Sequence, residues 1–150
     1  MGEYDKYFIY DTPLHPEHPG SRHNDPSVPW SDTLYIDNEL DGKLPGAYYL
    51  ETCMIRRTGS QPRLLESHTH PFAEYLIFLS TNPDDEFDLG GAVELWLGGE
   101  KHTITRTCAV FAPADMPHCP LIVHRVDRPF MFITTGPSLG YNYPEGALPA

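Results

Sequence analysis

Apolar and polar positions alternate with a period of two over much of the chain beyond residue 46. Residues 47–55, "AYYLETCMI", alternate in this way and are rich in the β-branched and aromatic residues that favour a pleated strand. Residues 74–80, "EYLIFLS", are nearly all apolar, which is typical of a strand buried on both faces. These segments predict strands.

More strands are predicted towards the C-terminus. Residues 92–105, "AVELWLGGEKHTIT", indicate a strand, a Gly-Gly hairpin turn and a second strand. Residues 108–126 and 128–135 add further strands, interrupted at 113–117 and at 127–128. With 16 prolines and 12 glycines, the chain has no sustained helical period longer than about twelve residues. Seven or eight closely spaced strands predict an all-β antiparallel sandwich or barrel, and a jelly-roll barrel fits best.

The length of 150 residues predicts one domain with a substantial core. Residues 1–46 are expected to form a proline-rich, extended N-terminal arm and the first edge strands, 47–136 the barrel, and 137–150 a C-terminal tail. Residues 11–29 hold five prolines among polar residues, with His15, His18 and His23. These histidines are interpreted as solvated rather than as a second metal site, because the segment lacks a regular element that would fix ligand geometry.

The formal net charge of -11 disfavours binding to nucleic acid or to an anionic membrane surface. No segment approaches the roughly 18 apolar residues of a membrane helix, and the N-terminus does not resemble a secretory signal. The three cysteines, Cys53, Cys108 and Cys119, show no metal-clip spacing and imply no disulfide framework. A cytoplasmic protein is therefore expected.

The candidate chemistry lies in "ESHTHPFAEYLIFL", residues 66–79. In an extended chain His68 and His70 project from the same face, and Glu74 can join them. The segment is either half of a metal site or an ordinary polar strand end. A single strand cannot surround an ion, and His118, in "FAPADMPHCPL", is the best candidate for a ligand from a distant strand.

Three imidazoles and one carboxylate leave open positions on a six-coordinate iron, manganese, nickel or cobalt ion. These metals are preferred over zinc, whose structural sites are usually closed and four-coordinate. The expected cofactor is one divalent transition metal.

Both segments resemble conserved motifs of the cupin superfamily. "HTHPFAE" is similar to the first motif, HxHxxxE, and "PADMPH" to the second, PxGxxH, in the same order along the chain. The resemblance covers roughly residues 47–135 and implies a cupin-type jelly-roll barrel, or double-stranded β-helix. It also implies that one divalent metal is held by His68, His70, Glu74 and His118.

The chain departs from the family pattern at several positions. Thr107 stands where the second motif usually begins with glycine, Asp115 replaces its turn glycine, and Ile122 stands where asparagine is often found. An acidic insert at 84–88 lengthens the connection between the motifs. None of these changes removes a ligand, but they weaken the transfer of any one subfamily's substrate.

Two functions remain open. The first is a metalloenzyme acting on a small enolisable, diketone, diol or phenolic substrate, dioxygenase-like or isomerase- or lyase-like, with Glu74 as a ligand or a general base. The second is a non-catalytic binding or sensor protein that uses the same cavity. A homodimer is expected in either case.

Other polar and aromatic residues have plainer interpretations. His102 and His124 are expected at the surface; the alternative for His124, which lies an even number of residues from His118, is that it shares the face of His118. Cys119 is expected to be an inert buried thiol on the face opposite to His118. The acidic insert is interpreted as a solvated loop, with a lid over the pocket as the alternative. Six aromatic strand residues are expected to be mostly core: Tyr75, Phe78, Trp96, Phe111, Phe130 and Phe132.

Overall fold

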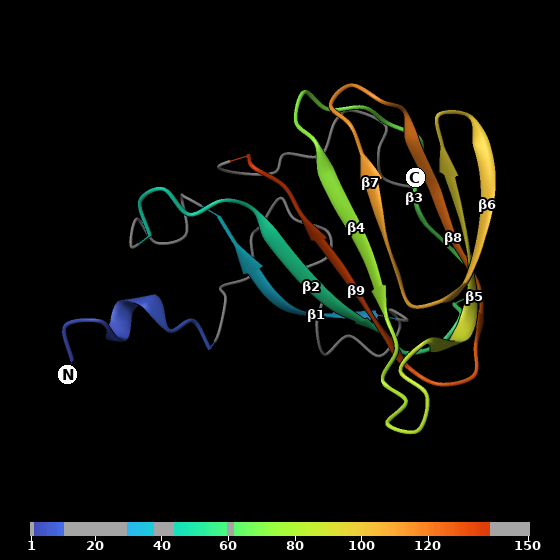
Figure 1. Cartoon of the computed structure of the whole chain (residues 1–150), viewed down its shortest axis with the longest axis horizontal. Helices are drawn as coiled ribbons and strands as arrows, with labels where there is room; N and C mark the ends of the chain where they lie inside the picture. The colour runs from blue at the N-terminus through green and yellow to red at the C-terminus, as the bar shows by residue number, and fades with distance from the viewer. Residues whose placement is uncertain (1, 11–29, 38–43, 60–61, 139–150) are drawn as a thin grey trace.

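The computed structural model describes residues 2–10, 30–37, 44–59 and 62–138 as two facing β-sheets, shown in Figure 1. The predicted arm, with His15, His18 and His23, lies largely outside these residues, as does most of the predicted tail. The nine strands are β1 (Trp30–Ile36), β2 (Leu50–Ile55), β3 (Arg63–Leu65), β4 (Glu74–Leu79), β5 (Asp88–Leu97), β6 (Glu100–Arg106), β7 (Cys108–Ala112), β8 (His118–Val126) and β9 (Phe130–Thr135). A single 3₁₀ turn, η1 (Asp5–Tyr7), precedes them among the described residues.

The chain crosses repeatedly between the two sheets. The first sheet has five strands in the order β1-β2-β9-β4-β7, and the second has four in the order β3-β8-β5-β6. All neighbouring strands are antiparallel. From β2 to β5, and again from β6 to β9, each connection carries the chain to the opposite sheet. This is a jelly roll, and the all-β prediction is confirmed.

The core fills the space between the sheets. Its largest buried members include Phe78, Leu89, Leu95, Leu121 and Phe130. They come from β4 and β9 of the five-stranded sheet and from β5 and β8 of the other. Alternation along each strand explains this arrangement, because every second side chain points between the sheets.

The hairpin between β5 and β6 turns at Gly98 and Gly99, as the Gly-Gly pair predicts. Both glycines have positive φ, 59° and 83°, and Leu97 pairs directly with Glu100. A two-residue hairpin turn of this kind requires positive φ at both positions, which glycine adopts without a steric penalty.

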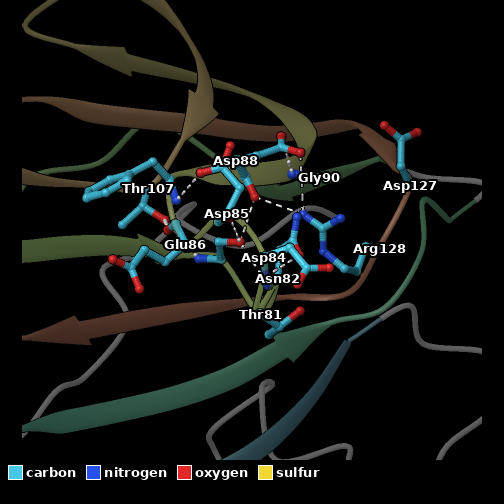
Figure 2. A network of polar contacts seen from close by, with 12 residues as sticks. Thr81, Asn82, Asp84, Asp85, Glu86, Asp88, Gly90, Thr107, Asp127 and Arg128 are labelled. Carbon is cyan, nitrogen blue, oxygen red and sulfur yellow. Dashed lines mark hydrogen bonds and ion pairs between the residues drawn. The ribbon is translucent and has the colours of Figure 1, made fainter.

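The acidic insert forms an ordered crossover between β4 and β5, drawn close up in Figure 2. The Ser80 hydroxyl donates to the Asp88 carbonyl at 2.6 Å and accepts the Asn82 amide at 3.0 Å. The Thr107 hydroxyl donates to the Glu86 carbonyl at 2.7 Å and accepts the Ser80 amide at 3.0 Å. Hydroxyl groups therefore link this crossover to the one between β6 and β7.

This loop lies at the opposite end of β4 from Glu74 (Figure 1). Six strand residues span roughly 20 Å, so the loop does not cover the residues at the start of β4. The lid alternative is therefore wrong for the histidine end of the barrel. Among the described residues, no helix has the length and apolar character needed to cross a membrane.

Candidate metal centre

The two histidine motifs meet through an isolated β-bridge. His68 and His118 exchange backbone hydrogen bonds, His68 N to His118 O at 3.0 Å and His118 N to His68 O at 3.1 Å. His68 precedes β4, whereas His118 opens β8 in the other sheet. The bridge places a sequence-distant ligand candidate directly beside the first motif.

The side chains of His68, His70 and His118 converge. All three are buried, and each can offer a ligand nitrogen such that the three nitrogens lie within 4.8 Å of one another. The ring centroids of His68 and His70 lie 4.4 and 4.7 Å from that of His118. Three buried histidines that could bind a metal ion are therefore present in one place.

Backbone carbonyls define the tautomer of each ring. The Nδ1 atoms lie 2.8 Å from Glu66 O for His68, 2.8 Å from Phe72 O for His70, and 2.9 Å from Met116 O for His118. Because a carbonyl oxygen only accepts, each Nδ1 carries the proton and donates it, and each Nε2 retains a lone pair. Metal-binding histidines are commonly held in this way by their other ring nitrogen.

Glu74, the first residue of β4, is the acidic member of the cluster. Its Oε1 lies 3.7 Å from Nε2 of His70 and 3.6 Å from Nε2 of His118. Burial alone would raise the pKa of this carboxyl, but its contacts with His118 and His70 outweigh burial and lower the pKa below its usual value. Glu74 is therefore an ionised carboxylate in a buried setting.

The surroundings of His68 and His118 shift their pKa values in opposite directions. Burial lowers the pKa of His68, and the neighbouring rings of His118 and His70 add to this effect against the opposing Glu66 carbonyl. Burial also acts to lower the pKa of His118, but Glu74 and the Met116 carbonyl outweigh it and raise the pKa above its usual value. Within the described residues, the buried Nε2 of His118 has no hydrogen-bond partner. These observations fit a donor set for a divalent cation, which would take up the Nε2 lone pairs and compensate the carboxylate charge.

Asp115, at the position of the motif's turn glycine, lies in the turn before His118. Its φ is 64°, the left-handed conformation that the family's glycine would adopt and that aspartate tolerates. The Asp115 amide donates to the His70 carbonyl at 2.9 Å. The turn thereby ties the second motif to the backbone of the first.

The histidines outside the motifs are remote from the cluster. His124 is half exposed, and its Nε2 lies 2.9 Å from Glu94 Oε1 on the outer face of the four-stranded sheet. His102, also half exposed, lies near Glu100 on β6. Both are surface residues as expected, and the alternative that His124 shares the face of His118 is wrong.

Cys119 departs from the expected alternation. It has a φ of 70°, so the backbone does not continue as a regular strand from His118, and both residues are buried. Burial, followed by the nearby Glu74 and Glu66, raises the pKa of the Cys119 thiol well above its usual value. The thiol is therefore inert as predicted, but it belongs to the main core rather than to an opposite face.

The sequence interpretation missed an aromatic group beside the histidines. Phe72 stacks on His70 with ring centroids 4.0 Å apart and an interplanar angle of 10°. Tyr49 packs edge-on against Phe72 and hydrogen-bonds Thr134 through its hydroxyl. Phe72 lies inside the first motif, so its position could have been noticed from the sequence. Tyr49 immediately precedes β2 and Thr134 lies in β9, and neither segment carries a motif.

No protein-family model and no curated protein sequence matches the chain. Similar solved structures exist. Oxalate oxidase in complex with the substrate analogue glycolate has 10% sequence identity and a TM-score of 0.51, over 89% of this chain and 61% of that one. KdgF from Halomonas sp. has 15% identity and a TM-score of 0.45, over 76% and 83% of the two chains. An RmlC-like cupin from Shewanella frigidimarina has 9% identity and a TM-score of 0.46, over 83% and 92%.

At such low identity the oxalate oxidase structure bears on the fold alone. It agrees with the two-sheet topology of this chain. The protein is thus a jelly-roll protein with a candidate metal centre. Its fold is similar to that of the oxalate oxidase structure, which agrees with the jelly-roll barrel expected from the motifs.

Proposed function

We propose that this protein is a small metal-dependent enzyme that holds one divalent transition metal through His68, His70, His118 and Glu74. The observation that carries the proposal is the convergence of three buried imidazoles whose Nδ1 atoms are all engaged by backbone carbonyls. Such preorganisation fixes the direction of each Nε2 before any ligand arrives.

The position of Glu74 supports a role as the fourth ligand. Two ligands bound at about 2.1 Å to one ion lie roughly 3 to 3.5 Å apart, close to the separations between Glu74 Oε1 and the two imidazoles. Three nitrogens and one oxygen suit iron, manganese, nickel or cobalt, which keep further positions open. When bound, the metal would supply Lewis-acid polarisation of a carbonyl or hydroxyl oxygen and, if redox-active, electrons for dioxygen chemistry.

The chain's own groups add proton transfer and positioning. Because the Glu74 carboxyl is ionised and buried, it can accept a proton from a carbon or hydroxyl group of a substrate. Phe72, stacked on His70, holds that ring in place and excludes water from one side. These roles suit a small enolisable, diketone, diol or phenolic substrate, in a dioxygenase-like or an isomerase- or lyase-like reaction.

The first test is metal content. Protein purified without a chelating resin is analysed for elements and then melted with and without a chelator. We expect about one divalent transition metal per chain and a melting temperature that falls on metal removal. Metal well below one per chain, together with a melting temperature insensitive to chelator, would refute the metal centre.

The second test separates catalysis from binding alone. The metal-loaded protein is screened for oxygen uptake and for product formation with small diols, diketones, phenols and hydroxy acids, including glycolate. Turnover that disappears in Glu74→Gln while metal is retained indicates a base, whereas joint loss of metal and turnover indicates a ligand. Saturable binding without turnover would instead establish the non-catalytic sensor alternative.

A further inference from the structure

The outer face of the five-stranded sheet is uncharged and largely apolar across four adjacent strands. Directly paired residues share a face, and one row runs from Phe111 on β7 through Tyr75 on β4 to Thr135 on β9 and Leu50 on β2. A second row runs from Ala109 through Ile77 and Ile133 to Thr52, and a third from Leu79 through Met131 to Met54. These three rows are called the outer apolar face below.

The outer apolar face contains no charged side chain in β2, β4, β7 or β9. A solvent-facing surface is typically about a quarter to a third charged, and this chain has 21 acidic residues. Phe111, Tyr75 and Leu79 are nevertheless 51%, 48% and 41% exposed, and the rings of Tyr75 and Phe111 contact at 5.3 Å. The prediction that Tyr75 and Phe111 belong to the core is wrong, and a contiguous apolar patch of this kind indicates an interaction surface.

A second unburied apolar group lies at the N-terminus. Tyr4, Tyr7, Phe8 and Tyr10 are 59–81% exposed, and their segment lies apart from the two sheets in Figure 1. In the described structure, one chain thus presents two apolar surfaces that do not cover each other.

We propose that two copies of this chain associate through their outer apolar faces, and that residues 4–10 of each copy extend over the other. Charge argues for a second copy as the occupant. Two chains with a net charge of -11 repel each other, and an uncharged face is the surface on which they can approach closely. A basic partner protein would find no complementary charge on this face.

The area also favours this arrangement. Four strands about 4.8 Å apart and roughly 20 Å long give a face of ~400 Å², below the ~800 Å² per partner of a standard interface. Four exposed aromatic side chains of up to about 150–250 Å² each supply the missing area. The sheet and the N-terminal segment are therefore sufficient together, whereas the sheet alone is not.

The test is the mass of the full-length protein in solution, measured by sedimentation over a range of concentrations. We expect twice the chain mass of 17.0 kDa. Phe111→Glu and Leu79→Glu replace side chains that are already about half exposed, so each monomer should fold, and each should weaken association roughly 30-fold or more. Phe87→Glu, at a 55% exposed phenylalanine outside this face, is the matched control and should leave association unchanged.

The N-terminal contact has its own variant, in which Tyr7, Phe8 and Tyr10 are each replaced by serine. We expect about tenfold weaker association with unchanged circular dichroism and metal content. An unchanged dissociation constant would refute the contact made by residues 4–10. A wild-type protein that stays at 17.0 kDa, or a dimer that withstands both glutamate substitutions, would overturn the proposal.

Discussion

The two sheets distribute polarity in opposite ways. The four-stranded sheet is conventional: Val93 and Leu95 face the core, and Glu94 between them lies on the outer side with His124. The five-stranded sheet places the carboxyl group of Glu74 inside and the aromatic ring of its neighbour Tyr75 outside. Burial of apolar surface explains the first pattern but not the second.

In our interpretation, the five-stranded sheet, with a carboxylate inside and an apolar face outside, is the sheet that carries function. A buried carboxylate is unfavourable unless something compensates it, and an exposed apolar face is unfavourable unless something covers it. For Glu74 the compensating groups are the buried histidines, and for the outer apolar face we propose a second copy. From this comparison we infer that this protein binds other molecules at the places that depart from the usual arrangement of apolar side chains inside and polar side chains outside.

Two further acids show the same contrast. Burial, together with the carboxylate of Glu51, raises the pKa of Asp32 to about 9 in the five-stranded sheet. In the four-stranded sheet the Trp96 indole, which donates to Glu94 at 2.6 Å, and then His124 lower the pKa of Glu94 to about 2. The same chemical group is thus disfavoured as an anion at Asp32 and favoured as an anion at Glu94.

The largest expected effect distinguishes the two histidines of β8. His118→Ala should weaken metal binding by more than the roughly 10–100-fold that loss of a supporting hydrogen bond produces. His124→Ala, on the outer face of the same strand, should leave it unchanged. Titration with a divalent metal under identical conditions measures both, and equal affinities in the two variants would remove the distinction between inner and outer histidines.

The next effect concerns Asp32→Asn. Because the pKa of Asp32 is about 9 in the folded protein and 3.8 ordinarily, the folded protein holds a proton that the unfolded chain releases, so wild-type stability falls as pH rises between these values. The variant should lose this dependence. Its free energy of unfolding relative to wild type should therefore rise with pH, by at most about 1.4 kcal/mol per pH unit. Urea unfolding across this range, with exposed Asp127→Asn as control, measures the difference; a gap between Asp32→Asn and wild type that does not grow with pH contradicts it.

A smaller effect is expected where the two crossovers between the sheets meet. Thr107→Val removes the hydroxyl that accepts the Ser80 amide and donates to the Glu86 carbonyl. The free energy of unfolding should fall by about 1–2 kcal/mol. Thr103→Val, at an exposed position of β6, is the matched control, and equal stability of the two variants would show that these bonds do not hold the crossover.

The smallest effect is the counterpart of the Asp32 experiment. Because the pKa of Glu94 is about 2 in the folded protein and 4.5 ordinarily, its contribution to stability is present above pH 4.5 and is lost as pH falls towards 2. Glu94→Gln should therefore be less stable than wild type at neutral pH and approach it in acid. A stability difference that is constant with pH, measured by urea unfolding, would show that the charge of Glu94 is not what its neighbours stabilise.

Local spacing accounts for much of the candidate site. His68 and His70 were paired by their separation of two residues, and the turn at Asp115 was anticipated from the motif. The orientation of His124 could not be predicted from spacing, because an even separation from His118 implies a shared face only in an unbroken strand. The register of β8 against β5 shifts twice, and Cys119 has a left-handed backbone, so an even separation from His118 no longer means a shared face.

The strand β4 shows a second limit. Both of its faces are apolar apart from Glu74, so its pattern does not say which face is inward. Exchanging the two faces leaves a period of two unchanged, and only the neighbouring strands decide between them. This is why Tyr75 and Phe111, which pair across β4 and β7, were assigned to the core.

By itself, the sequence determined the strand periodicity, the hairpin at Gly98 and Gly99, and the candidate ligands in two short motifs. Each of these is local, since it depends on residues a few positions apart. Only the tertiary structure decided that His68 bridges to His118 and that the five-stranded sheet turns an uncharged apolar face outward. Both depend on pairing between distant strands, and no spacing within one strand contains that information.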